Sequence, residues 1–246
     1  MSEPTLIFTS QKQSASEPTL IFGLGGVLVD SQMIANTVFS EHLARIGVPM
    51  TPEQATERFR GRRLDDCVQL VKSYHGVDLS DDFLDALQSE TLARLRTDLQ
   101  PIPHIEGALT SLPNRRCLAS SSSPAQIDLS LTVTGLDRFF PAEQRFSADQ
   151  VEWGKPDPAL FRLAATQMGV RDTNCIVIED SSAGARAARQ AGMPVLGFAP
   201  GGHNQDPLVA AGAIVFSDMR SLPTMVQAVW ANVVAVKGDR VSCFKV

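Results

Sequence analysis

The stretch IFGLGGVLVDS, residues 21–31, joins an apolar run to a glycine-rich turn and then to an acid and a serine. Backbone N–H groups in a glycine turn at the end of a strand can cradle a phosphate. We therefore predict that Thr19–Phe22 form the first core strand and that the turn after it either cradles an anion or is a plain tight turn. Gly23 and Gly25, the turn positions best placed for chemistry, carry no side chain.

A duplication precedes this stretch. The sequence SEPTLIF occurs at residues 2–8 and again at residues 16–22. The copies do not continue, so they do not indicate a repeat architecture. Only the second copy leads into the glycine turn, and we expect residues 1–15 to form a mobile N-terminal extension.

A helical segment follows the turn. From residue 32 to residue 99, apolar residues recur at intervals of three and four, the period of an amphipathic helix. Ser80 stands before a pair of acids, as an N-cap residue does at the start of a helix. No strand-like alternation interrupts these residues, so the sequence predicts an inserted helical domain.

Strands and helices alternate from residue 100 onward. The sequence predicts strands at RCLASS, CIVIED and PVLGF and helices at residues 108–112, 124–134, 158–168 and 183–191. This alternation is typical of an α/β fold, with a Rossmann-like, doubly wound parallel sheet covered on both faces. The expected parts are a core of residues 16–31 and 100–223, an inserted α-helical cap domain of residues 32–99, and a C-terminal helix and tail of residues 224–246.

Composition excludes some classes of function. The 246 residues carry a net charge of −5 with a pI near 5.4, so the basic face needed for nucleic acid is not expected. No apolar run is long enough to span a bilayer, and the polar N-terminus lacks the apolar region of a signal peptide. We expect a cytoplasmic protein with reduced thiols, because its cysteines are far apart and form no CxxC pair. They are Cys67, Cys117, Cys175 and Cys243.

Two further predicted strand ends carry groups suited to an anion, because ligands of such sheets bind beyond the carboxyl ends of the strands. In LASSSSP, the hydroxyls of Ser120 and Ser121 come at a strand end and before a helix start. The alternative is a serine-rich loop in which Ser123 serves as the N-cap of the next helix. In WGKPDPALF, prolines fix the loop that presents Lys155. The alternative is an ordinary solvated lysine.

A fourth strand end carries acids. The stretch IVIEDSSAG places Glu179 and Asp180 after an apolar strand and before a helix. Carboxylates clustered in this way suit a hard cation such as Mg²⁺, which takes oxygen ligands. The alternative is that Asp180 or Ser181 serves as a helix N-cap.

Together the four motifs resemble a known family. In their order, and with a helical insertion after the first, they resemble the haloacid dehalogenase-like phosphatases that carry a helical cap. The resemblance covers roughly residues 16–222 and rests on GVLVDS, GKPDP and IEDSSAGARAARQAGMPVLGF. The stretch GFAPGGH further resembles the subgroup that acts on small phosphorylated sugars, polyols or sugar acids.

The resemblance implies a loss of catalytic groups. In the family the first loop reads DxDGxxxDS, where the first Asp attacks the phosphoryl group and the second acts as general acid and base. Those positions are Gly23 and Gly25 here, so both carboxylates are missing. Asp30 is not expected to replace them, because it lies several residues beyond the turn.

The resemblance also assigns the phosphate contacts. Ser120, or Ser121 in the other register, would hydrogen-bond a phosphate oxygen, and Lys155 would neutralise its charge. The backbone N–H groups of Leu24 and Gly25 would complete the cradle.

The metal assignment follows in the same way. Asp180, with Glu179 directly or through water, and the backbone carbonyl of Gly25 would bind Mg²⁺. Position 23 also supplies a metal ligand in the family, so we expect Mg²⁺ binding to be weakened or absent.

The predicted cap carries a further signal. In FRGRRLDDC, residues 59–67, Arg62 or Arg63 could clamp a second anionic group such as a carboxylate. The alternative is a pair of solvated arginines. Of the remaining residues, His203 is expected at the surface, and Trp153 is expected to pack rather than to recognise a ligand.

Three hypotheses for function remain. The chain is an inactive relative that binds a small phosphorylated metabolite; or it is a Mg²⁺-dependent sugar-phosphate phosphatase in its native form, with the two glycines engineered or erroneous; or it is a structural or interaction protein. Neither nucleic acid nor a membrane is an expected partner, and the oligomeric state stays open.

Overall fold

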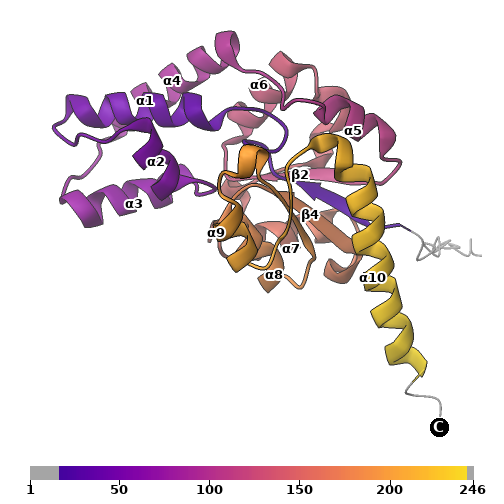
Figure 1. The fold of residues 1–246 in the computed structure, drawn as a ribbon. Coiled ribbons are helices and arrows are strands. Elements are labelled where there is room, and N and C mark those ends of the chain that lie inside the picture. The colour runs from indigo at the N-terminus through magenta and orange to yellow at the C-terminus, as the bar shows by residue number, and fades with distance from the viewer. Residues whose placement is uncertain (1–16, 243–246) are drawn as a thin grey trace, which may run out of the picture.

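A computed structural model describes residues 17–242, with side chains to residue 235. The extension expected at residues 1–15 and Cys243 lie outside the described residues. The fold is α/β: a sheet lies between helices on both faces, and a separate group of helices stands beside it (Figure 1). The strands are β1 Thr19–Phe22, β2 Arg116–Ser120, β3 Arg145–Ser147, β4 Cys175–Glu179, β5 Val195–Phe198 and β6 Ile214–Phe216.

The six strands are all parallel, in the order β3-β2-β1-β4-β5-β6. The chain moves outward from β1 to β3 on one side and then from β4 to β6 on the other. The strand order therefore reverses between β1 and β4, and in a doubly wound sheet a ligand crevice opens at the carboxyl ends of such a strand pair.

The helices follow the predicted alternation. They are α1 Gln32–Arg45, α2 Pro52–Phe59, α3 Leu64–His75, α4 Asp81–Asp98, α5 Ile105–Ser111, α6 Pro124–Thr134, α7 Ala159–Gln167, α8 Ser182–Gln190, α9 Gln205–Ala210 and α10 Leu222–Ser242. None of those between residues 17 and 242 is long and apolar enough to cross a membrane.

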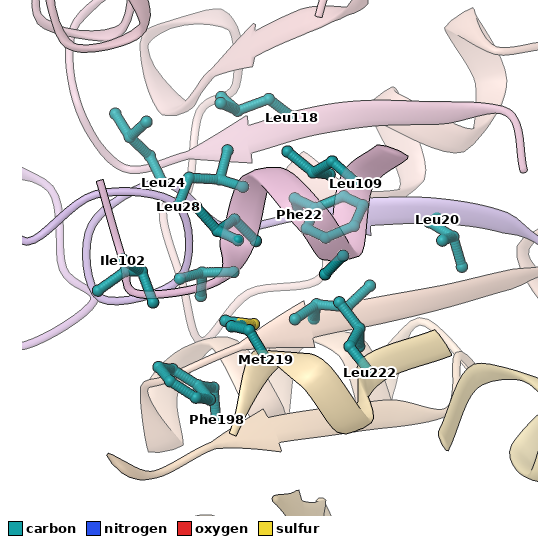
Figure 2. Packing of buried hydrophobic residues seen from close by; sticks show 14 of the residues in the cluster. Leu20, Phe22, Leu24, Leu28, Ile102, Leu109, Leu118, Phe198, Met219 and Leu222 are labelled. Carbon is teal, nitrogen blue, oxygen red and sulfur yellow. The ribbon is translucent and has the colours of Figure 1, made fainter. Parts of the chain in front are cut away.

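Successive strand residues pack against opposite layers of helices. Leu20 and Phe22 of β1 join α5, α6 and α10 in one hydrophobic cluster, shown in Figure 2. Ile21, between them, joins α7 and α8 in a second cluster. Because both faces are covered, the central strands consist of buried, mostly apolar residues, as expected of a parallel sheet.

Helices α1 to α4, which we call the cap, bury a hydrophobic cluster of their own. Phe39 of α1 and Phe59 of α2 meet there, with ring centroids 5.2 Å apart. Ser80 accepts a hydrogen bond from the backbone N–H of Phe83, so the predicted N-cap of α4 is confirmed. The division of the chain into core and cap at residues 32 and 99 stays a prediction.

The sequence missed some elements of the core. Strands β3 and β6 have three residues each, too few to show a period, and α9 has six. Helix α10 begins two residues before the segment predicted as a C-terminal helix and tail, and it continues to Ser242. Trp153 was expected to pack, but 60% of it is exposed, so that expectation is wrong.

Candidate active site

The register of the central strands brings the predicted motifs together. Phe22 is paired with Leu118 of β2 and with Ile178 of β4, so the turn after β1 stands level with the ends of both neighbours. The N–H of Gly23 donates to the carbonyl of Ile178 at 2.9 Å. Leu24 turns its side chain into the hydrophobic core, so only its backbone faces the ligand side (Figure 2).

Three glycines of the turn differ in what they require. Gly26 has a φ of +76°, and a Cβ on it would lie 2.3 Å from Oδ2 of Asp180. Gly23 and Gly25 lie outside the left-handed region. A Cβ on Gly23 would lie 3.3 Å from Glu179 Oε1, and a Cβ on Gly25 would lie 2.7 Å from the rotatable Oγ of Ser31. The fold therefore needs glycine at 26, but its backbone angles do not demand glycine at 23 or 25.

Lys155 forms a buried ion pair with Oε1 of Glu179, and each side chain is 3% exposed. The ammonium group also donates to the carbonyl of Ala119 at 3.1 Å, and it lies 4.9 Å from the ring centroid of Phe161. The alternative of a solvated surface lysine is therefore wrong. The role of Lys155 toward a phosphate stays a prediction.

The second oxygen of Glu179 is fully engaged. Oε2 accepts hydrogen bonds from the N–H groups of Asp180 and Ser181, at 3.1 and 3.2 Å, and from the Ser181 hydroxyl at 2.9 Å. Ser181 Oγ in turn accepts from the N–H of Gly184 at 3.0 Å and is the N-cap of α8. Of the two N-cap alternatives, Ser181 is the correct one.

Asp180 is held by two residues that the sequence analysis did not single out. Its Oδ2 accepts from Gln32 Nε2 at 2.6 Å and from Arg60 Nη1 at 2.9 Å. Burial and the neighbouring Glu179 raise the pKa of Asp180 to about 7. Arg60, in the loop after α2, lowers it, as does the hydrogen bond from Gln32. A third overlooked residue, Asn204, donates to the backbone carbonyl of Asp180 at 2.5 Å.

As arranged, these groups do not fit Mg²⁺. Both oxygens of Glu179 are bound to protein donors, and one oxygen of Asp180 is shared by Gln32 and Arg60. The carbonyl of Gly25 accepts from Gln32 at 3.3 Å. Mg²⁺ demands near-octahedral oxygen ligands, usually with several waters. Within residues 17–242, no cluster of three His, Cys, Asp or Glu side chains could hold a metal ion.

The serine run has three distinct roles. Ser120 ends β2, is 4% exposed, and accepts from the N–H of Ser122 at 3.0 Å. Ser121 donates to the carbonyl of Gly61, in the loop after α2, at 2.8 Å. Ser123 is the N-cap of α6, so the capping alternative is confirmed for that residue. Ser120 and Ser121 both line the site, and their role toward phosphate stays a prediction.

A cavity of about 370 Å³ lies between the core motifs and the cap, a size suited to a small metabolite. Arg62 and Arg63 both line it, so the site brings the predicted clamp residues to the core motifs. Arg63 is paired with Asp66 at 3.3 Å, whereas the guanidinium of Arg62 makes no hydrogen bond or ion pair within the described residues. His203 is exposed, as expected.

The three cysteines that the structure describes lie in its interior. Cys67, Cys117 and Cys175 are buried thiols and form no disulfide among themselves, in line with the expected reduced state. Cys67 also lines the cavity, and burial raises its pKa to about 12. A thiol is nucleophilic only as the thiolate, so Cys67 does not supply a nucleophile at neutral pH.

Known proteins of similar sequence share this architecture. A family model described as haloacid dehalogenase-like hydrolase matches residues 20–198. The 6-phosphogluconate phosphatase of Escherichia coli strain K12 is 30% identical over 210 residues, which cover 85% of this chain and 94% of that relative.

Solved structures agree. A haloacid dehalogenase-like protein of unknown function from Agrobacterium tumefaciens is 36% identical, with a TM-score of 0.74 over 87% of this chain and 99% of its own. A hydrolase of the same family from Deinococcus radiodurans, with bound phosphate and sodium, is 28% identical, with a TM-score of 0.68 over 88% and 98%. Because the matched segment holds β1, β2, β4 and the cap between them, the chain belongs to the haloacid dehalogenase-like hydrolases.

Proposed function

We propose that this chain binds a small phosphorylated sugar or sugar acid in the cavity between cap and core and does not hydrolyse it. The phosphoryl group would meet the ends of β1, β2 and β4, where Lys155 and Ser120 lie. The guanidinium of Arg62 would meet a second anionic or hydroxyl-rich end of the ligand. The E. coli relative, a 6-phosphogluconate phosphatase, supports a ligand with a phosphate at one end and a carboxylate at the other.

One observation carries the proposal. A Cβ on Gly23 would lie 3.3 Å from Glu179 Oε1, so a side chain there would face the Lys155–Glu179 pair. The position has none. Without a group that can attack phosphorus, no covalent intermediate forms. Without an acid or base at position 25, the rate would fall by a further factor of about 10²–10⁴.

Nearby groups do not take over the attack. Asp30 is exposed and is not among the residues that line the cavity. Asp180 is held by Gln32 and Arg60. Unactivated water entering the space beside Gly23 is a poor nucleophile.

A second candidate function is a sugar-phosphate phosphatase whose native residues 23 and 25 are aspartates. The backbone favours this candidate over a purely structural role, because neither glycine adopts an angle that excludes a side chain. Substitution of aspartate at positions 23 and 25 would then restore both carboxylates, with no other change to the site.

The deciding experiment compares the chain with its Gly23→Asp/Gly25→Asp variant. Both are assayed with Mg²⁺ against a panel of sugar phosphates that includes 6-phosphogluconate. Gly107→Asp is the matched control, since Gly107 has open space around it and lies in α5, outside the lining of the cavity. We expect turnover above background in the double variant alone. Equal turnover in the unaltered chain would refute the inactive-site proposal.

Calorimetry with the same panel tests the binding half. We expect 6-phosphogluconate to bind the unaltered chain. Arg62→Gln should lower the affinity for 6-phosphogluconate more than it lowers the affinity for inorganic phosphate. Absence of binding to every member of the panel would leave the structural or interaction role as the better account.

A further inference from the structure

The loop after α2 reaches down onto the core at the site of the acidic motif. Arg60 Nη1 lies 2.9 Å from Asp180 Oδ2, and the carbonyl of Gly61 accepts from Ser121 at 2.8 Å. A Cβ on Gly61 would lie 2.2 Å from Ser181 Oγ. The approach is therefore close enough that position 61 excludes any side chain, and it delivers Arg60 to a carboxylate that is 5% exposed.

The two buried carboxylates at the base of the site are each paired with a cationic side chain. Lys155 pairs with Glu179, and Arg60 pairs with Asp180, which gives two positive and two negative groups. A buried carboxylate is costly unless it is paired and hydrogen-bonded. Arg60 supplies the charge for Asp180, and Gln32 supplies a second hydrogen bond to the same oxygen.

We infer that Arg60 takes the place of a divalent cation at Asp180, so that the chain binds oxyanions without Mg²⁺. A divalent ion that binds Oδ2 of Asp180 and the carbonyl of Gly25 would have to displace Gln32 from both atoms. It would also bring two further positive charges beside Arg60 and Lys155. Arginine and metal are therefore alternative occupants of one carboxylate, and removal of Arg60 exposes a latent cation site.

The cation half of this inference is independent of the proposed function, while the oxyanion half rests on it. Mn²⁺ serves as the probe because electron paramagnetic resonance counts the free ion directly, with no need for turnover. The variants are Arg60→Gln, Arg60→Lys and Arg60→Gln/Asp180→Asn. Arg58→Gln is the control, since Arg58 is an exposed arginine of the same helix–loop segment that stacks on Tyr74.

The unaltered chain, Arg58→Gln and Arg60→Lys are expected to bind Mn²⁺ alike and weakly. Arg60→Gln should bind it about tenfold more tightly or better, the range of coupling between two mutually exclusive ligands. The double variant should lose that gain, which would locate the ion at Asp180. Arg60→Lys keeps the positive charge while it removes the guanidinium. If Arg60→Gln gained affinity for Mn²⁺ only because the fold had loosened, Arg60→Lys should gain affinity as well.

Any of three outcomes overturns the inference. Mn²⁺ binding to the unaltered chain as tight as to Arg60→Gln would show that the arginine excludes nothing. A folded Arg60→Gln that gains no affinity would show that Asp180 is not a latent ligand. A separate titration with inorganic phosphate, in EDTA and in Mg²⁺, should give equal affinities. Binding in Mg²⁺ alone refutes the inference, and binding in neither refutes the proposed function while the Mn²⁺ result stands.

Discussion

Replacement of Lys155 by methionine tests whether this lysine supports the fold as well as the site. The Lys155 side chain is 3% exposed, and its ammonium group is paired with Glu179, which is equally buried. Methionine preserves most of the volume and removes the charge. Glu179 then keeps its three donors on Oε2 but loses its cation on Oε1.

The magnitude follows from these contacts. Breaking a buried ion pair by removing one partner costs about 3–5 kcal/mol. The donors that remain on Oε2 of Glu179 place this cost near the lower end of the range. The carbonyl of Ala119 also loses one hydrogen bond, which costs about 1 kcal/mol. We expect Lys155→Met to lower the free energy of unfolding by about 3–4 kcal/mol. That loss is a large share of the free energy of unfolding of a typical domain, which is roughly 5–15 kcal/mol.

Urea unfolding of a double-mutant cycle measures this effect. Glu179→Gln alone should cost about 3 kcal/mol, because it leaves the ammonium buried without a counter-ion. The Lys155→Met/Glu179→Gln variant has no unpaired charge, so the coupling energy should reach about 2 kcal/mol or more. Lys72→Met is the control: Lys72 pairs with Asp78 at 2.6 Å, but both are exposed, and the loss should stay below about 1 kcal/mol.

Additive losses in the cycle would refute the reasoning, because they would mean that the two charges do not depend on each other. A loss at Lys155 no larger than that at Lys72 would refute it as well.

Three further predictions follow from single residues. Gly26→Ala should destabilise the fold by about 1–2 kcal/mol from backbone strain alone, as measured by urea unfolding. The loss should be larger if the side chain of Asp180 cannot move away from the new Cβ. Hydrogen bonds from His42 and Arg94 lower the pKa of Glu90 from 4.5 to about 2, so the stability that Glu90 contributes is present above pH 4.5 and is lost as the pH falls toward 2. The difference in Tm between the unaltered chain and Glu90→Gln should therefore shrink on acidification; a constant difference would contradict the assignment. Cys67, with a pKa of about 12 instead of 9.0, should carry about a thousandfold less thiolate than an ordinary thiol, and peptide mass spectrometry should find it unmodified by iodoacetamide at pH 8 until the chain unfolds.

The sequence predicted the parts of the fold that carry local signals. Strands β1, β2 and β4 are buried apolar runs that end in glycine, serine or acid, and such runs are legible without a structure. Strands β3 and β6 were missed because three residues in a parallel sheet carry no period. Trp153 was misjudged because an aromatic residue in a loop gives no local sign of whether it is covered.

The site was predictable where one motif supplies one group. Lys155, Glu179 and Asp180 each follow from their own stretch of sequence. The partners of Asp180 do not, because Gln32 lies 148 residues away and Arg60 lies 120 residues away. A signal was present in both cases. Gln32 directly follows the first motif, and Arg60 stands two residues before Arg62, the first of the two arginines predicted from the same cap loop.

The exposed indole of Trp153 can serve as an intrinsic fluorescent probe. The other tryptophan, Trp230, is 8% exposed in α10, away from the cap. Trp153 adjoins Gly154, where a Cβ would lie 3.1 Å from the side chain of Arg63, in the cap between α2 and α3. Emission that is quenched by acrylamide should thus arise mainly from Trp153, and changes in its wavelength or lifetime would report on the contact between core and cap without any attached dye.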